Sequence, residues 1–166
     1  RRITLDKFDV IHAPSLFSDG GLALKAYKEY GVPYVVAVRN TDINVFIKYL
    51  KHTHYIGREI ALKAKKIFFI SKGEMDEFIE SDFARPIYSQ IKDKMALQPN
   101  GIENHWHEHI SHTPRRGHQI LYVGDFTPNK NVCRVIKAIA QLRKETEFAD
   151  LKFVIVGGGK DKYGTT

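Results

Sequence analysis

Short apolar segments alternate along the chain with longer segments of helical period, and this alternation predicts β-α-β units. The apolar segments are rich in Val, Ile, Phe and Tyr. Most are apolar on both faces, as expected for a parallel sheet that is covered on both sides. Strands are expected at residues 9–13, 34–38, 67–70, 119–123 and 151–156, with a weaker one at 95–98. The pattern therefore predicts an α/β protein.

The clearest helix is predicted over residues 132–144, where apolar residues recur at intervals of three and four. A helix over residues 22–30 should end at Gly31. Ser71 can cap a helix over 74–79. The segment that follows Asp42 also has helical spacing and continues at 56–65, and Asp42 is expected to cap it rather than to bind a ligand.

The chain is expected to divide into two domains. Residues 104–116 have no hydrophobic period and contain several His residues and a Pro, which predicts a linker between residues 1–103 and 117–166. A single β-α-β unit buries too little apolar surface to be stable alone, so the second domain is expected to be incomplete. Its exposed sheet edges should favour self-association.

Composition narrows the choice of partners. Apolar residues make up 43% of the chain and charged residues 27%, which excludes a disordered protein. The net charge of +7 favours an anionic partner such as a nucleotide diphosphate, a phospholipid surface or nucleic acid. The single cysteine, Cys133, excludes an intramolecular disulfide and fits a reducing compartment, and no apolar run is long enough to span a membrane.

Several short motifs follow one another along nearly the whole chain. They are FDVIHAP at 8–14, GVPYVV at 31–36, AKKIFFIS at 64–71, QPNGIE at 98–103, ILYVG at 120–124, Pro128, Lys130 and VIVGGG at 154–159. In this order they resemble the family 4 retaining glycosyltransferases. The resemblance implies the GT-B fold, with two Rossmann-like parallel-sheet halves, both incomplete in this chain. Residues 1–103 would be the acceptor-side domain, and 117–166 the first β-α-β unit of the nucleotide-sugar-binding domain.

The resemblance also implies an activity. Such an enzyme transfers a sugar from a nucleotide-sugar donor to a saccharide or lipid-linked acceptor with retention, in polysaccharide or glycoconjugate synthesis. It needs no cofactor and no metal, and it is cytoplasmic or peripheral at the inner face of the membrane. The chain starts without Met and lacks the E-x7-E motif of the family, so it looks like an internal piece that is inactive alone.

Donor phosphate is expected at Gly124 and Lys130. A lysine that opens a helix after a glycine-containing strand end can pair with phosphate beside free backbone N–H groups. The alternative is a solvated surface lysine. Asp125 departs from the family, which usually has Arg there, and its carboxylate would either repel phosphate or cap the turn.

Acceptor residues are expected at the carboxyl ends of the strands of the first domain, where open α/β sheets bind ligands. Arg39 and Asn44 follow one strand and could contact a sugar hydroxyl, a carboxylate or a phosphate. Ser18, Asp19 and Gly20 follow an earlier strand and would line the cleft between the domains.

Other features leave alternatives open. His105, His107 and His109 alternate in the linker but lack a cage of Cys or carboxylate ligands, so no metal is expected. A basic stretch suits a solvated helix face or, alternatively, peripheral contact with a membrane surface. It contains Lys48, Lys51, His52, His54, Arg58, Lys63, Lys65 and Lys66.

Two rival functions remain. One is a non-catalytic nucleotide- or sugar-binding module with a Rossmann-like fold, which Asp125 and the absent acidic motif favour. The other is nucleic-acid binding, which only the pI of about 9.4 suggests. Nucleic acid is not expected as a partner, because no aromatic and basic recognition motif is present.

Overall fold

The computed structural model describes residues 7–110 and 118–158. The chain divides between Asn104 and His105 into two compact units, called unit 1 and unit 2 below, and each is described by itself. Both units contain parallel strands joined through helices, which confirms the prediction of an α/β fold built on parallel sheets.

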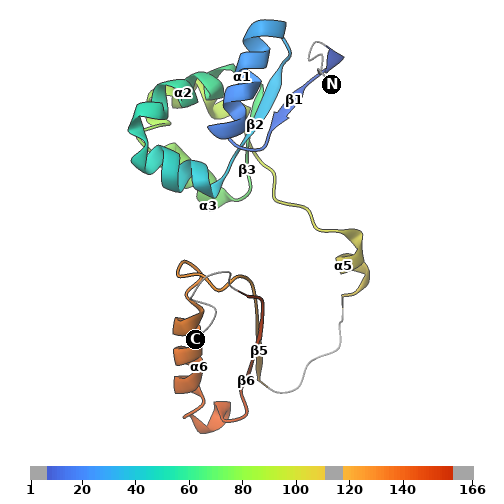
Figure 1. The fold of residues 1–166 in the computed structure, drawn as a ribbon, viewed down its shortest axis with the longest axis vertical. Helices are drawn as coiled ribbons and strands as arrows, with labels where there is room; N and C mark the ends of the chain where they lie inside the picture. Colours follow the sequence, from blue (N-terminus) through green and yellow to red (C-terminus); the bar gives the residue numbers. More distant parts are fainter. Residues whose placement is uncertain (1–6, 111–117, 159–166) are drawn as a thin grey trace. The chain divides into compact units, whose positions relative to one another are not determined.

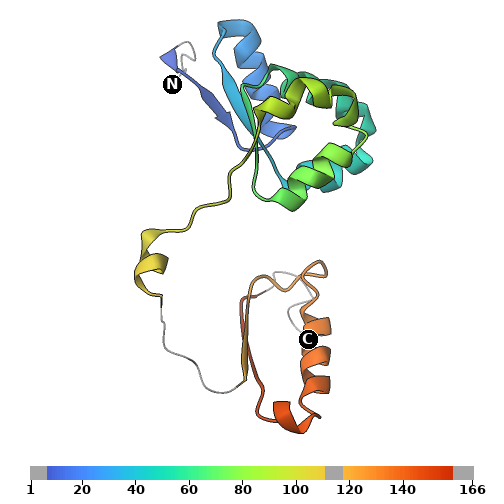
Figure 2. The ribbon, with the colours of Figure 1, turned by 180° about the vertical axis from the view of Figure 1, so that it is seen from behind.

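Unit 1 is built on a four-stranded parallel sheet in the order β1-β2-β3-β4. Figures 1 and 2 show its helices gathered on one side of this sheet. That arrangement follows from the strand order, because right-handed crossovers between successive neighbouring strands all pass over the same face. The strands are β1 (Ile11–Ala13), β2 (Tyr34–Val38), β3 (Lys66–Phe69) and β4 (Met95–Leu97).

The longer helices of unit 1 lie close to the positions expected from the sequence. Helix α1 begins at Ser18, four residues before the expected start, and ends at Gly31, whose φ of 74° is left-handed. The Oγ of Ser71 caps α3 by accepting a hydrogen bond from the N–H of Glu74 at 3.2 Å. The helical segments are α1 (Ser18–Tyr30), the π-helical η2 (Asp42–Ile47), η3 (Lys51–Thr53), α2 (His54–Lys63), α3 (Lys72–Glu80), η4 (Arg85–Ile87), α4 (Tyr88–Ile91) and η5 (Lys92–Lys94).

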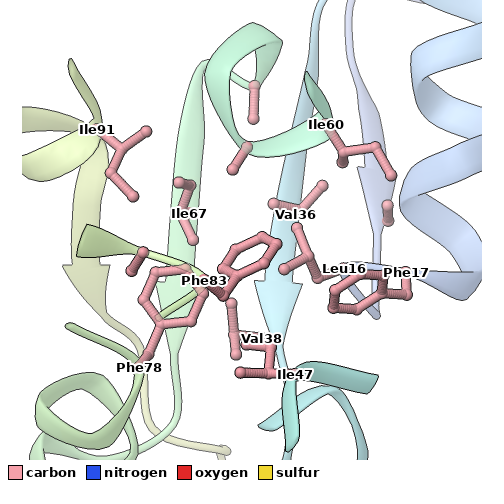
Figure 3. Packing of buried hydrophobic residues seen from close by; sticks show 14 of the residues in the cluster. Leu16, Phe17, Val36, Val38, Ile47, Ile60, Ile67, Phe78, Phe83 and Ile91 are labelled. Atoms are coloured by element: carbon pink, nitrogen blue, oxygen red, sulfur yellow. The ribbon is translucent and has the colours of Figure 1, made fainter. Parts of the chain in front are cut away.

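The core of unit 1 lies between the sheet and these helices (Figure 3). Phe83 is fully buried, and its ring packs against the rings of Phe17 and Phe78 with centroid distances of 5.6 and 5.5 Å. Gly57 of α2 faces the same rings, and a Cβ there would lie 2.9 Å from Cε2 of Phe83. Glycine is therefore required for this helix to pack so closely on the aromatic cluster.

Unit 2 is smaller. Its two parallel strands, β5 (Gln119–Val123) and β6 (Lys152–Val156), are connected through α6 (Val132–Leu142) and η6 (Thr146–Phe148). The register places Leu121 beside Val154 and Val123 beside Val156, on one face of the sheet, and all four side chains are exposed. The sequence predicts sheets covered on both faces. This prediction is wrong for the described residues, because the helices of unit 1 gather on one side of its sheet and the described part of unit 2 leaves this face uncovered.

The predicted linker, residues 104–116, is helical in its first five residues, which form α5 (Asn104–Glu108). Residues 111–116 of that linker, and Gly159 of the glycine motif, lie outside the described residues. Within residues 7–110 and 118–158, no helix has both the length and the apolar character that crossing a membrane requires.

Candidate functional site

Polar residues gather at the carboxyl ends of the strands of unit 1, and Arg39 connects them. Its Nε donates a hydrogen bond to the carbonyl oxygen of Pro14 at 3.0 Å, and its Nη1 donates to Oδ1 of Asn100 at 3.2 Å. Pro14 follows β1, Arg39 follows β2 and Asn100 lies in the turn after β4. One guanidinium group thus joins the loops that follow β1, β2 and β4.

A buried carboxylate holds two of these loops together. Asp42, only 1% exposed, accepts hydrogen bonds from the backbone N–H groups of Leu16 and Phe17, both at 3.1 Å, and of Arg39 at 2.9 Å. Burial raises the pKa of the Asp42 carboxyl group, while these three N–H donors act in the opposite direction. The prediction that Asp42 caps the segment after it is wrong, because the carboxylate reaches back to Arg39 and across to the start of α1.

The residues expected after β1 are in the first turn of α1. The N–H of Asp19 donates to Oγ of Ser15 at 3.0 Å, and its carboxylate accepts a hydrogen bond from the same hydroxyl at 2.8 Å. Ser18 is exposed. Gly20 is buried, and a Cβ there would lie 2.8 Å from Cγ2 of Ile60, so its small size allows α1 to approach α2.

Asn44 lies within η2 and is partly buried. Its side chain makes no hydrogen bond to any residue in the described part of the chain. Arg39 and Asn44 therefore differ, because the guanidinium group of Arg39 is fixed by two neighbouring loops and the amide of Asn44 has no comparable restraint.

Glu74, at the start of α3, lies near Arg39, and the sequence does not predict it as a site residue. Its Oε2 is buried and has no hydrogen-bond partner among the described residues. Burial raises the pKa of the Glu74 carboxyl group, and the positive charge of Arg39 partly offsets this effect. The sequence Ser71-Lys72-Gly73-Glu74 predicts a capping box, in which the Glu carboxylate returns to the N–H of Ser71. Only the other half of that box forms, so the carboxylate is left beside Arg39.

The strand ends of unit 2 approach each other closely through two glycines. The N–H of Gly124 donates to the carbonyl oxygen of Val156 at 3.0 Å, and the N–H of Phe126 donates to the carbonyl oxygen of Gly158 at 3.1 Å. Gly124 and Gly157 have φ values of 157° and 148°. A Cβ on Gly157 would overlap the carbonyl group of Gly124, so only glycine fits there.

Lys130 lies in the turn that precedes α6. Its N–H donates to the carbonyl oxygen of Thr127 at 3.0 Å, and Asn131, with a left-handed φ of 50°, separates it from the first helical residue. Lys130 is exposed and forms no ion pair with any residue of 7–110 or 118–158. It therefore precedes the helix by two residues instead of opening it.

Asp125 follows Gly124 and is exposed. Its carbonyl oxygen accepts a hydrogen bond from the hydroxyl of Tyr122 at 2.9 Å. Its carboxylate has no hydrogen-bond partner in the described ranges, so capping of the turn by this side chain is not observed there. A negative charge thus remains at the end of β5.

One segment of the chain matches a known protein family, and it contains Gly124, Gly157, Asp125 and Lys130. Residues 107–165 match the family model of glycosyl transferases group 1. The match supports a GT-B glycosyltransferase and therefore sugar transfer, and this family implies binding of a nucleotide-sugar donor and a sugar acceptor. A search of curated proteins found no match to the chain.

Among the described residues, His105, His107 and His109 do not form part of a potential metal site. No three His, Cys, Asp or Glu side chains gather there as potential ligands. His105 and His109 of the α5 region lie with their rings 4.1 Å apart, in contact with each other. These side chains therefore interact within one short helical turn.

Proposed function

We propose that this protein is a retaining glycosyltransferase that transfers a sugar from a nucleotide-sugar donor to a saccharide or lipid-linked acceptor, in polysaccharide or glycoconjugate synthesis. The observation that carries the proposal is the family match over residues 107–165, which contains the glycine pair, Gly124 and Gly157, and Lys130. The resemblance of the motifs in residues 8–103 to family 4 enzymes supports the same activity for unit 1.

The donor diphosphate would bind beyond the carboxyl end of β5. Gly158, just after β6, has open space around its Cα, and the first N–H groups of α6 have no side-chain cap. The ammonium group of Lys130 is exposed and unpaired among the described residues, so it can form a charge-assisted hydrogen bond with a phosphate oxygen. Such contacts would stabilise the charge that develops on the departing diphosphate.

The acceptor would bind at the carboxyl edge of unit 1. Saccharide hydroxyls both donate and accept hydrogen bonds, and this edge offers both kinds of partner. Arg39 keeps further N–H donors after its bonds to Pro14 and Asn100, and the partly buried carboxylate of Glu74, whose charge interacts with Arg39, is the acceptor beside it. These groups would orient an acceptor hydroxyl, and orientation is a large part of the catalysis of a transfer between two bound substrates.

Binding measurements on the full chain test the donor site. UDP, GDP and ADP are titrated by calorimetry, and the best ligand is then titrated into Lys130→Ala and into Lys137→Ala, an exposed lysine on α6 that serves as the matched control. Loss of one charge-assisted phosphate contact is expected to weaken binding roughly tenfold in Lys130→Ala. Equal affinity of the two variants would contradict the assignment of Lys130.

A non-catalytic nucleotide- or sugar-binding module is the second candidate, and Asp125 favours it. At 4 Å a carboxylate repels a phosphate charge by about 1 kcal/mol in water. Asp125→Asn is therefore expected to strengthen diphosphate binding several-fold. Release of free sugar from the nucleotide sugar, measured by chromatography on a longer chain that also carries the E-x7-E motif, separates the two candidates. Release that Lys130→Ala abolishes indicates the transferase, because a binding module would retain its ligand intact.

A further inference from the structure

Five lysines gather at the amino ends of β3 and β4, at the edge of the unit 1 sheet opposite to Arg39. They are Lys63, Lys65, Lys66, Lys92 and Lys94. Lys63 ends α2, while η5 (Lys92–Lys94) leads directly into β4. Because β3 and β4 are parallel neighbours and Ile67 lies beside Met95, the residues that precede these two positions are also adjacent.

Three of these lysines line one pocket. Its volume is about 460 Å³, and Lys63, Lys65 and Lys94 form its charged wall. The remaining wall is uncharged and largely apolar, and no acidic residue takes part in it. Its members are Tyr27, Gly31, Pro33, Leu62 and Ala64.

Backbone carbonyl groups, not carboxylates, hold the lysine side chains in place. The Nζ of Lys94 donates to the carbonyl oxygen of Leu62 at 2.6 Å, and that of Lys66 donates to the carbonyl oxygen of Asp93 at 3.4 Å. The nearby Glu59 forms its ion pair with Lys28. The charge of Lys94 is therefore positioned in the pocket without being neutralised, and Lys63 and Lys65 form no ion pair with a described residue.

The charges of the pocket also act on one another. Burial lowers the pKa of the Lys94 ammonium group, and the positive charges of Lys65 and Lys63 lower it further. A helix C-terminus attracts cations, which accounts for Lys94 and Lys63 beside the end of α2. It does not account for Lys65, which is exposed, lies beyond the helix and makes no side-chain hydrogen bond to a described residue.

We propose that this lysine pocket binds a phosphate group, carried either by an anionic lipid headgroup or by a free phosphate-bearing molecule. Positive charges that share a pocket without an acidic residue form a natural site for such an anion. The apolar part of the wall suits the uncharged remainder of the ligand. The site is separate from the donor site of unit 2, and the inference does not rest on the proposed sugar transfer.

The test uses the full chain, with pyrophosphate as the soluble probe and vesicles of phosphatidylglycerol and phosphatidylcholine as the lipid probe. The double variant Lys63→Gln/Lys65→Gln removes two exposed charges without touching the hydrogen bond of Lys94. Lys137→Gln/Lys144→Gln in unit 2 removes the same charge and is the matched control. Amide chemical shifts of residues 63–66 and 92–94 report this pocket separately from any binding at Lys130.

At least a fivefold loss of affinity is expected in the Lys63/Lys65 variant, and less than a twofold loss in the control. Vesicle binding that pyrophosphate inhibits identifies the lipid headgroup as the ligand, and pyrophosphate binding without vesicle binding identifies a free phosphate compound. Circular dichroism verifies that both double variants are folded. The proposal is overturned if neither probe shifts these amides, or if both variants lose binding equally.

Discussion

Unit 1 and unit 2 use the same parallel β-α connection but bury very different amounts of apolar surface. Unit 1 packs its helices on a four-stranded sheet around aromatic rings, and the side chain of Phe83 is fully buried there. In the described part of unit 2, the buried apolar residues are Val132, Ile139 and Leu151. The difference teaches that strand pairing alone does not make a core, because the apolar face of a sheet is buried only where helices cover it.

The largest test of this comparison removes a core ring from unit 1. Phe83→Ala is expected to lower the free energy of unfolding of unit 1 by about 3–5 kcal/mol, since it deletes a buried ring and leaves a cavity among Phe17, His54 and Phe78. Urea unfolding followed by amide hydrogen exchange in unit 1 measures the change. Leu121→Ala, on the uncovered face of unit 2, is the control and should change stability by less than about 0.5 kcal/mol. Similar losses in the two variants would refute the contrast between the units.

A substitution at the strand ends tests unit 2 by itself. Gly157→Ala is expected to destabilise unit 2 by about 1–3 kcal/mol, because the new methyl group overlaps the Gly124 carbonyl and the backbone is held at a positive φ. Amide exchange should accelerate in β5 and β6 and stay unchanged in unit 1.

Gly158→Ala supplies the matched control for that experiment, since a Cβ there has open space around it. If the amides of β5 and β6 exchange at the same rate in both alanine variants, the close contact between Gly157 and Gly124 is not the reason that residue 157 must be glycine. If unit 1 also loses protection, the two units do not unfold separately.

The smallest effect concerns a surface pair in unit 2. His118 forms a hydrogen bond with Asp150 at 2.9 Å, and this bond holds the pKa of the Asp150 carboxyl group below its ordinary value of 3.8. Since the folded pKa is depressed, the stabilisation is present above pH 3.8 and is lost as pH falls through the folded value. His118→Gln should raise the pKa of Asp150, as measured by carbon NMR of the carboxyl group. His52→Gln, in unit 1, should leave this titration unchanged.

Secondary structure could be predicted well where local pattern and packing agree. The strands β2 and β5 have the bounds that their apolar runs predict, residues 34–38 and 119–123. The sequence pattern places the start of α1 too late, because Gly20 and Gly21 in its first turn lower local helix propensity. Gly20 is helical because it allows close contact with Ile60, and that contact is not visible in the local sequence.

The candidate site was harder to predict because its contacts join distant segments. Asp42 was predicted to serve the helix that follows it, whereas two of its three hydrogen bonds reach residues 25 and 26 positions earlier in the chain. Glu74 lies in a sequence typical of a helix cap, which predicts that its carboxylate is hydrogen-bonded to the backbone. In the described structure its Oε2 has no hydrogen-bond partner. The position of Arg39 after a strand predicts a ligand contact, but its bond to Asn100 spans 61 positions and cannot be predicted from the local sequence. The ligand roles proposed for Lys130, Gly124, Arg39 and Asn44 stay predictions.

The hydrogen bonds of Asp42 and Arg39 have a thermodynamic consequence for any ligand of this edge. Loops that are disordered before binding lose conformational entropy when a ligand fixes them, and this loss weakens the complex. Here the loops after β1 and β2 are already joined by Asp42, and Arg39 is already fixed to Pro14 and Asn100. A ligand would therefore meet an edge whose loops were ordered during folding, and its affinity would not be reduced by the entropy cost of ordering them.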